Sequence, residues 1–323
     1  MLNRRSVLSV GLSIFAGAVL SLSPAVAAPS EIRVDFATYN PVSLVLKERK
    51  ILEKAFEKDG ITIRWVQSLG SNKALEFLNA SSIDFGSTAG AAALIAKING
   101  NPIKSIYVYS RPEWTALVTR KDTGITKVAD LKGKRVAVTR GTDPHIFLVR
   151  ALAEAGLTEK DVKLVLLQHA DGRLALERGD VDAWAGLDPM MAAAEIEGGA
   201  VLFYRKPEAN TWGILNVRES FAAENPEIVK RVLAAYEEAR QWALANPEEL
   251  KKIFISVTKL PEAVVERQLS TRTELTHSAI GAPQRESILA AGLALQQAGV
   301  LPSDADVKAA VDKLIDPSYL AAK

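Results

Sequence analysis

The sequence predicts an α/β protein made of two similar lobes, each a mainly parallel sheet flanked by helices, with a ligand cleft between the lobes. Three observations predict this fold class. Strand-like and helix-like segments alternate from residue 31 to about residue 204, which is typical of parallel sheets covered by helices. One helix–strand phrase occurs twice. The remainder, from about residue 225, is almost purely helical.

The repeated phrase lies at residues 75–87, LEFLNASSIDFGS, and at residues 173–185, RLALERGDVDAWA. At this offset Asp84 aligns with Asp182, and each copy leads into a glycine-containing junction. Helix–turn–strand units also recur by chance in α/β proteins. Two copies nevertheless suggest two halves whose equivalent strand ends face one cleft, and we expect the two aspartates to be structural.

The first lobe is expected at residues 28–111. Its predicted strands are residues 32–38, 61–67, 83–86 and 103–109, and its predicted helices are residues 42–58, 71–79 and 91–98. Apolar residues at helical spacing indicate the 42–58 helix, and alternation indicates the 61–67 strand.

The second lobe is expected at residues 112–212. Its predicted strands are residues 114–119, 135–139, 162–167, 181–185 and 201–204, and its predicted helices are residues 143–155, 171–178 and 189–197. Gly156 stands where the first of these helices must end.

Residues 213–323 are expected to return to the first lobe and add helices at 226–244, 247–256, 261–271 and 284–298. Pro226, Pro247 and Pro261 stand at first helical positions, where the missing N–H costs nothing. The chain would then cross between the lobes near Arg111 and again near residues 212–217. Two crossing segments between two lobes form a hinge.

Residues 1–27 have the pattern of a cleaved signal peptide: Arg4 and Arg5, an uncharged apolar run, and Ala25-Val26-Ala27. Export by the general or the twin-arginine route stays open. The chain has no cysteine, which excludes a lipid anchor on cysteine. Without the leader its acidic and basic residues balance, so nucleic acid and anionic membranes are poor partners. We expect a free periplasmic monomer.

Five strand-to-helix junctions are rich in glycine and hydroxyl side chains: residues 67–72, 86–90, 139–145, 170–172 and 186–189. Ligands of open α/β sheets bind at the carboxyl ends of the strands. Helix N-termini and hydroxyl groups there can hold an oxyanion. Any one junction could be an ordinary helix cap, but several at facing sheet edges predict an anion-binding cleft.

Some single side chains could contribute to that cleft. His145 could donate to an anionic head group, and Arg111 could pair with an anion from the crossing segment. Trp184 and Trp212 could wall an apolar part of the ligand, although each alone is more often a core residue. His169, at another strand end, ranks below His145.

Motifs of catalysis are missing from the sequence. It has no cysteine nucleophile, no G-x-S-x-G elbow, no P-loop, and no G-x-G-x-x-G after a strand. The three histidines are too scattered for a metal-ligand pattern. We therefore expect a protein that is not an enzyme and that needs no cofactor or metal.

Four stretches, residues 79–88, 128–137, 141–152 and 179–189, resemble the aliphatic sulfonate-binding proteins of ABC importers. They include V-A-D-L-K-G-K and G-D-V-D-A-W, and the resemblance runs in order through the mature chain. The broader group includes taurine, nitrate and thiamine-precursor binders.

The resemblance implies a type 2 periplasmic binding protein fold that closes on a small anionic or zwitterionic ligand. It also implies delivery to an ABC permease and ATPase at the inner membrane. Family ligand contacts correspond here to Gly70, Ser71, Ser87, Thr88, Thr142, His145 and Asp188. With Arg111 and Trp212, these form the predicted ligand-binding set.

Two departures from the family pattern concern the ligand. Leu187-Asp188-Pro189-Met190 stands where Trp-Asp-Pro-Tyr is frequent, and Asp143-Pro144 replaces part of a serine-rich run. A carboxylate beside a sulfonate would be repulsive unless Asp143 caps its helix or meets a ligand cation. Taurine, a sulfate ester, nitrate or a pyrimidine precursor of thiamine therefore remain alternatives to a simple sulfonate. A pyrimidine-synthase-like enzyme and a sensor ectodomain are alternatives of other classes.

Overall fold

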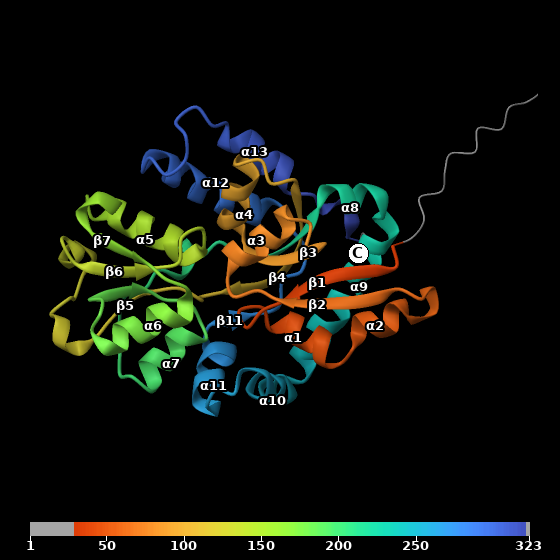
Figure 1. Cartoon of the computed structure of the whole chain (residues 1–323), viewed down its shortest axis with the longest axis horizontal. Coiled ribbons are helices and arrows are strands. Elements are labelled where there is room, and N and C mark those ends of the chain that lie inside the picture. The colour runs from red at the N-terminus through yellow and green to blue at the C-terminus, as the bar shows by residue number, and fades with distance from the viewer. Residues whose placement is uncertain (1–28, 321–323) are drawn as a thin grey trace, which may run out of the picture.

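A computed structural model describes residues 29–320, which form two α/β lobes joined side by side (Figure 1). The predicted signal peptide, residues 1–27, lies outside the described residues. Between residues 29 and 320 no helix is both long and apolar enough to cross a bilayer.

The first lobe contains a six-stranded sheet with the order β11-β4-β10-β3-β1-β2. Its strands are β1 (Glu31–Phe36), β2 (Thr62–Gln67), β3 (Phe85–Ala89), β4 (Ile103–Pro112), β10 (Gly213–Arg218) and β11 (Thr273–Glu274). The strands β1 to β4 run in one direction, whereas β10 and β11 run against them. The sheet is therefore mixed, because the chain re-enters this lobe through β10 from the cleft side.

The second lobe contains a five-stranded sheet with the order β7-β6-β8-β5-β9. Its strands are β5 (Leu117–Thr119), β6 (Arg135–Val138), β7 (Lys163–Leu166), β8 (Ala183–Ala185) and β9 (Val201–Tyr204). Only β5, the strand that enters the lobe, opposes the others. In each lobe, the strand that follows a crossing segment runs opposite to its neighbours in the sheet: β10 in the first lobe and β5 in the second. The exact lobe boundaries at residues 111 and 212 stay predictions.

Helices cover both sheets. Those of the first lobe are α1 (Pro41–Glu48), α2 (Ile51–Phe56), α3 (Ser71–Asn79) and α4 (Gly90–Ile98), and those of the second are α5 (Asp143–Glu154), α6 (His169–Arg178) and α7 (Met190–Ile196). The helix predicted over 42–58 is broken, because Lys50 takes a left-handed conformation with φ 55° and separates α1 from α2.

The C-terminal part adds α8 (Glu219–Glu224), α9 (Pro226–Ala245), α10 (Pro247–Thr258), α11 (Glu262–Thr271), α12 (Ala282–Gln297) and α13 (Val307–Leu314). As expected, α9 packs on α1 and α2, and α12 and α13 pack on α4. However, α11 also contacts α7, and α12 contacts α5. The tail therefore bridges both lobes, above and below the junction in Figure 1.

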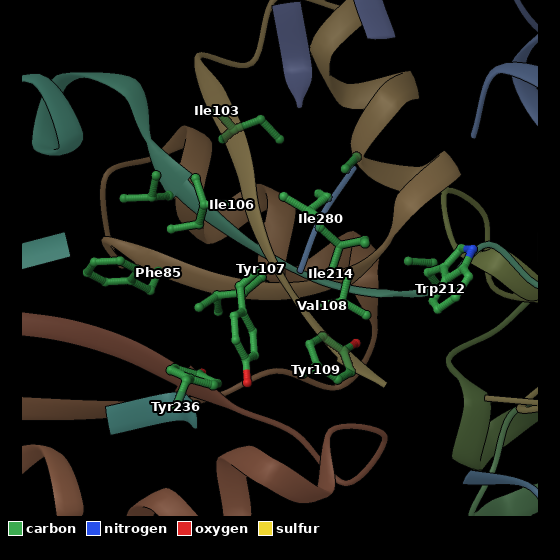
Figure 2. Close-up of a cluster of buried hydrophobic side chains, with 14 of the residues drawn as sticks. Phe85, Ile103, Ile106, Tyr107, Val108, Tyr109, Trp212, Ile214, Tyr236 and Ile280 are labelled. Atoms are coloured by element: carbon green, nitrogen blue, oxygen red, sulfur yellow. The ribbon is translucent and has the colours of Figure 1, made fainter. Parts of the chain in front are cut away.

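The largest hydrophobic core belongs to the first lobe. Figure 2 shows part of it, where side chains of β3, β4 and β10 meet those of α9. The rings of Tyr107 and Tyr236 lie 5.8 Å apart. In the second lobe the sheet has a core on each face. Val136 and Val138 pack toward α5, while Ala137 and Trp184 pack toward α6 and α7, as the alternation of a strand requires.

The repeated phrase corresponds to the same structural feature in both lobes. Asp84, before β3, accepts hydrogen bonds from the backbone N, Nε and Nη2 of Arg33 on β1. Asp182, before β8, accepts from the same three groups of Arg135 on β6. Each pair joins neighbouring strands at the end of the sheet remote from the cleft. The structural role predicted for both aspartates is therefore confirmed by their hydrogen bonds.

The two pairs differ in burial, which makes them a matched test. Asp84 is fully buried and also pairs with Arg218, whereas the side chain of Asp182 is 25% exposed. We predict that Asp84→Asn lowers the free energy of unfolding by about 3 kcal/mol, because Arg33 and Arg218, which are 26% and 15% exposed, both lose the buried charge that they pair with. Asp182→Asn should cost about 1 kcal/mol or less. Urea denaturation of both variants checks this; equal costs would contradict it.

Candidate functional site

A small cavity lies between the lobes at the carboxyl ends of the strands. It has a volume of about 10 Å³ and is lined by Tyr39, Ser71, Trp114, Thr142, Asp143, Pro144 and Leu187. The lining comes from the β1–α1 and β2–α3 junctions of the first lobe, from the β6–α5 and β8–α7 junctions of the second, and from a crossing segment. Such a volume holds about one water molecule. The lobes are therefore closed on each other in this structure.

Two helices from opposite lobes begin at the cavity. Ser71 is the first residue of α3, and Thr142 is the N-cap of α5. Helix N-termini carry free N–H groups and the positive end of the helix dipole. The hydroxyl of Thr142 donates to the carbonyl of Thr139 over 2.7 Å and keeps the loop before α5 in place. Both helices thus direct partial positive charge of the backbone toward the cavity, beside the Asp143 carboxylate.

Ser71, Ser87 and Thr88 are buried, and all three bond within the first lobe. Ser71 Oγ accepts from the backbone N–H of Ala89 over 3.0 Å, which ties the start of α3 to the end of β3. Thr88 Oγ1 accepts from Asn216 Nδ2 over 2.7 Å. Ser71 lines the cavity, whereas the other two lie behind it and hold the sheet edge in shape.

Ser87 bonds to a buried carboxylate. Its backbone N–H and its hydroxyl donate to Asp35 over 2.9 Å and 2.8 Å, and Asn40 Nδ2 donates to Ser87 Oγ. Complete burial raises the pKa of Asp35 to about 6, although the bonds from Ser87 oppose that rise. The hydroxyl of Ser87 is therefore engaged by the protein itself.

Asp143 connects α5 to both segments that cross between the lobes. Its carboxylate accepts from Trp114 Nε1 over 2.8 Å and from the hydroxyl and N–H of Thr211 over 2.6 Å and 3.1 Å. Trp114 follows β4 in the first crossing, and Thr211 precedes β10 in the second. Burial raises the pKa of Asp143 despite these three donors. The carboxylate that departs from the family pattern is thus a satisfied clamp at the hinge.

Asp188 does not line the cavity, although its neighbour Leu187 does. Its Oδ1 accepts from Arg272 Nη1 over 3.1 Å and from the N–H of Ala192 over 2.9 Å. Burial raises the pKa of Asp188 to about 6, while the charge of Arg272 opposes that rise. Arg272 follows α11 and also pairs with Glu195, so this buried pair joins the C-terminal helices to the second lobe.

The remaining predicted residues lie in other places. His145 is buried, with Nε2 2.9 Å from Glu159 Oε1 and with Nδ1 unpartnered among the described residues. Arg111 and Trp212 line a separate groove of about 710 Å³, where the guanidinium lies over the indole at 5.2 Å. Gly70 caps α3 beside the cavity. The structure therefore brings Gly70, Ser71 and Thr142 together and disperses the others, and the ligand role of every one stays a prediction.

Sequence reasoning missed Tyr39 and Trp114 as lining residues, whereas Leu187 belongs to the predicted junction at residues 186–189. Tyr39 stands in the β1–α1 junction and donates its hydroxyl to the carbonyl of Ser87. The same strand-end rule that singled out Ser71 would have found it. In residues 29–320 no group of three or more His, Asp or Glu side chains is arranged to hold a metal ion.

Comparisons with known proteins identify the family of the chain. The family model described as NMT1/THI5 like matches residues 55–250. The chain belongs to this family. A protein of Escherichia coli (strain K12) described as an aliphatic sulfonates-binding protein is 30% identical over 256 residues, which cover 79% of this chain and 80% of that one.

Two solved structures share the fold. The alkanesulfonate-binding protein SsuA from Xanthomonas axonopodis pv. citri, bound to MOPS, is 27% identical with a TM-score of 0.81, and the match covers 91% of this chain and all of that one. The periplasmic aliphatic sulphonate binding protein SsuA from Escherichia coli is also 27% identical, with a TM-score of 0.76 and coverage of 92% and 95%. The predicted two-lobe fold is therefore confirmed.

The clamp at Asp143 predicts a stability effect. Asp143→Asn should lower the free energy of unfolding by about 1.5–3 kcal/mol, because the amide turns an N–H toward Trp114 or Thr211 and leaves a buried donor unpaired. Urea denaturation followed by tryptophan fluorescence measures the change. Thr211→Ser, which keeps the hydroxyl that bonds to Asp143 and to the N–H of Ala91, should cost less. An unchanged midpoint in Asp143→Asn would contradict the clamp.

The raised pKa of Asp35 predicts that the stability of the protein depends on pH. A carboxyl whose pKa is raised by folding stabilises the native state below its unfolded pKa, near 3.8, and loses that contribution as pH rises through about 6. The melting temperature of the wild type should therefore carry a falling contribution between pH 4 and pH 6. Asp35→Asn should remove part of this fall, and an identical pH profile in the variant would be the contrary result.

Proposed function

We propose that the protein is the exported solute-binding component of an ABC importer. It captures a small organosulfonate or a related anion between its lobes and delivers it to the permease. The observation that carries this proposal is the meeting of two helix N-termini, those of α3 and α5, from opposite lobes at one buried cavity. Oxyanions bind at helix N-termini without a full countercharge.

The lining favours one negative charge over two. Among the described residues that line the cavity, no side chain is a lysine or arginine, and Asp143 contributes a carboxylate. Two helix ends supply about half a positive charge each. Because three hydrogen bonds from Trp114 and Thr211 already compensate the charge of Asp143, the helix ends suit one further negative charge. A sulfonate carries a single charge and offers no proton, whereas dianions of sulfate or phosphate exceed what the helix ends compensate.

Capture requires a change of lobe position. A cavity of about 10 Å³ cannot admit an organic anion, so the ligand enters an open form and the lobes close around it. The closed form alone presents donors from both lobes, so ligand binding shifts the equilibrium toward it. The two crossing segments, which Asp143 holds to α5, are the positions where that movement is absorbed.

The relatives support the ligand class and the location. Proteins similar over most of the chain are named for binding aliphatic sulfonates, and one of them is named as periplasmic. With the leader pattern in residues 1–27, this favours a periplasmic protein that works with an ABC permease and ATPase. An enzyme related to pyrimidine synthases is the second reading of this fold, and turnover of a bound compound would favour it.

Thermal denaturation with a ligand panel tests the proposal. Methanesulfonate, ethanesulfonate, taurine and MOPS at millimolar concentration should include at least one compound that raises the melting temperature. Saturation at a hundred times the Kd adds about 2.7 kcal/mol of stability, which is a shift of several degrees. Sulfate and phosphate at matched ionic strength serve as controls and should give no shift. If no sulfonate stabilises the protein, the proposed ligand class is wrong.

A further inference from the structure

A second set of polar side chains lies between the lobes, beside the N-terminus of α3. Gln168 and His169 come from the β7–α6 junction of the second lobe, and Asn72 comes from the first turn of α3. His169 and Asn72 both approach Gly70, since a Cβ placed on this residue would stand 3.2 Å from His169 Nε2 and 2.7 Å from Asn72 Oδ1. The glycine therefore lets two polar side chains of opposite lobes come close to each other.

The polar atoms in this place have no hydrogen-bond partner within the described chain. His169 is only 1% exposed, and neither of its ring nitrogens is bonded. The buried Asn72 Oδ1 and Gln168 Oε1 are also unpartnered. Leaving one buried polar group unsatisfied costs about 1–3 kcal/mol. Two such side chains, His169 and Asn72, at one glycine indicate a place where another molecule supplies the partners.

The surroundings favour an anionic partner. Gln168 is the N-cap of α6, which begins at His169, and Gly70 is the N-cap of α3. Two helices of nine and ten residues thus direct their positive ends toward the same place from opposite lobes. Burial lowers the pKa of His169 to about 3, so the imidazole is neutral and offers one N–H donor and one acceptor nitrogen.

We infer that His169 is a ligand-binding residue whose ring N–H donates to an oxygen of the anionic group of the ligand. That group lies at the N-terminus of α3, beside Ser71, between the cavity at the start of α5 and His169 at the start of α6. The inference rests on the proposed function and names its head-group site. Because Ser71 lines the cavity and Gly70 faces His169, the α3 N-terminus connects the two places. The rest of the ligand then extends toward Tyr39, Trp114 and Leu187.

The three histidines of the chain allow a direct test by NMR. In protein labelled with nitrogen-15 at histidine, the ring signals of His169 should move on addition of the sulfonate that gives the largest thermal stabilisation. They should settle on one tautomer, because one ring nitrogen then donates to a fixed oxygen. The ring of His277 is exposed and held by Glu274, so its signals should stay unchanged.

Calorimetry of variants measures the contribution. His169→Leu should weaken the binding of the same sulfonate at least about tenfold, the loss of one hydrogen bond to a charged group. His169→Gln, which keeps a donor, should recover part of the affinity. His277→Gln is the matched control and should bind as the wild type does. Gly70→Ala should weaken binding by filling the space between His169 and Asn72.

The outcomes of these experiments distinguish the head-group site at His169 from the proposed function. If the sulfonate stabilises the protein while the His169 signals stay fixed and His169→Leu or His169→Gln binds with wild-type affinity, the head-group site is wrong and the proposed function stands. If no sulfonate in the panel stabilises the wild type, both are wrong. The NMR experiment uses the unmodified protein, so it decides the question even where a variant does not fold.

Discussion

The arrangement of the two lobes depends on the carboxylate of Asp143. It stands at the start of α5 and accepts three hydrogen bonds from Trp114 and Thr211, which belong to the two different segments that cross between the lobes. One buried group therefore positions the second lobe's anion-facing helix relative to both hinge strands. Together with the bridging contacts of α11 and α12, it sets how the N-termini of α3 and α5 face each other across the cavity.

This constraint explains an electrostatic property of the cleft. A carboxylate is needed at the hinge, yet the neighbouring helix ends favour an anion. Since hydroxyl, indole and amide donors surround Asp143, its charge is compensated before a ligand arrives. The positive helix ends remain available for one additional negative charge. A neutral His169 fits the same scheme, because it supplies a donor without a further unpaired charge in the closed interface.

Much of the fold could be predicted from the sequence, since alternating strands and helices are local patterns. The junctions that hold Ser71 and Thr142 also follow from strand order. The directions of the side chains could not be predicted from the sequence, because they depend on residues that are not local. Asp188 bonds to Arg272, 84 positions away, and His145 contacts Glu159. The break at Lys50 and the bridging contacts of α11 and α12 with the second lobe likewise arise from tertiary packing that no local pattern records.

A crystal structure of the protein with the most stabilising sulfonate tests the central claim most directly. The account predicts that the sulfonate group lies between the lobes, with its oxygens at the N-termini of the helices beginning at Ser71 and Asp143 and with His169 within hydrogen-bond distance. A sulfonate bound instead in the groove of about 710 Å³ beside Arg111 and Trp212, with the interlobe cavity still empty, would contradict it.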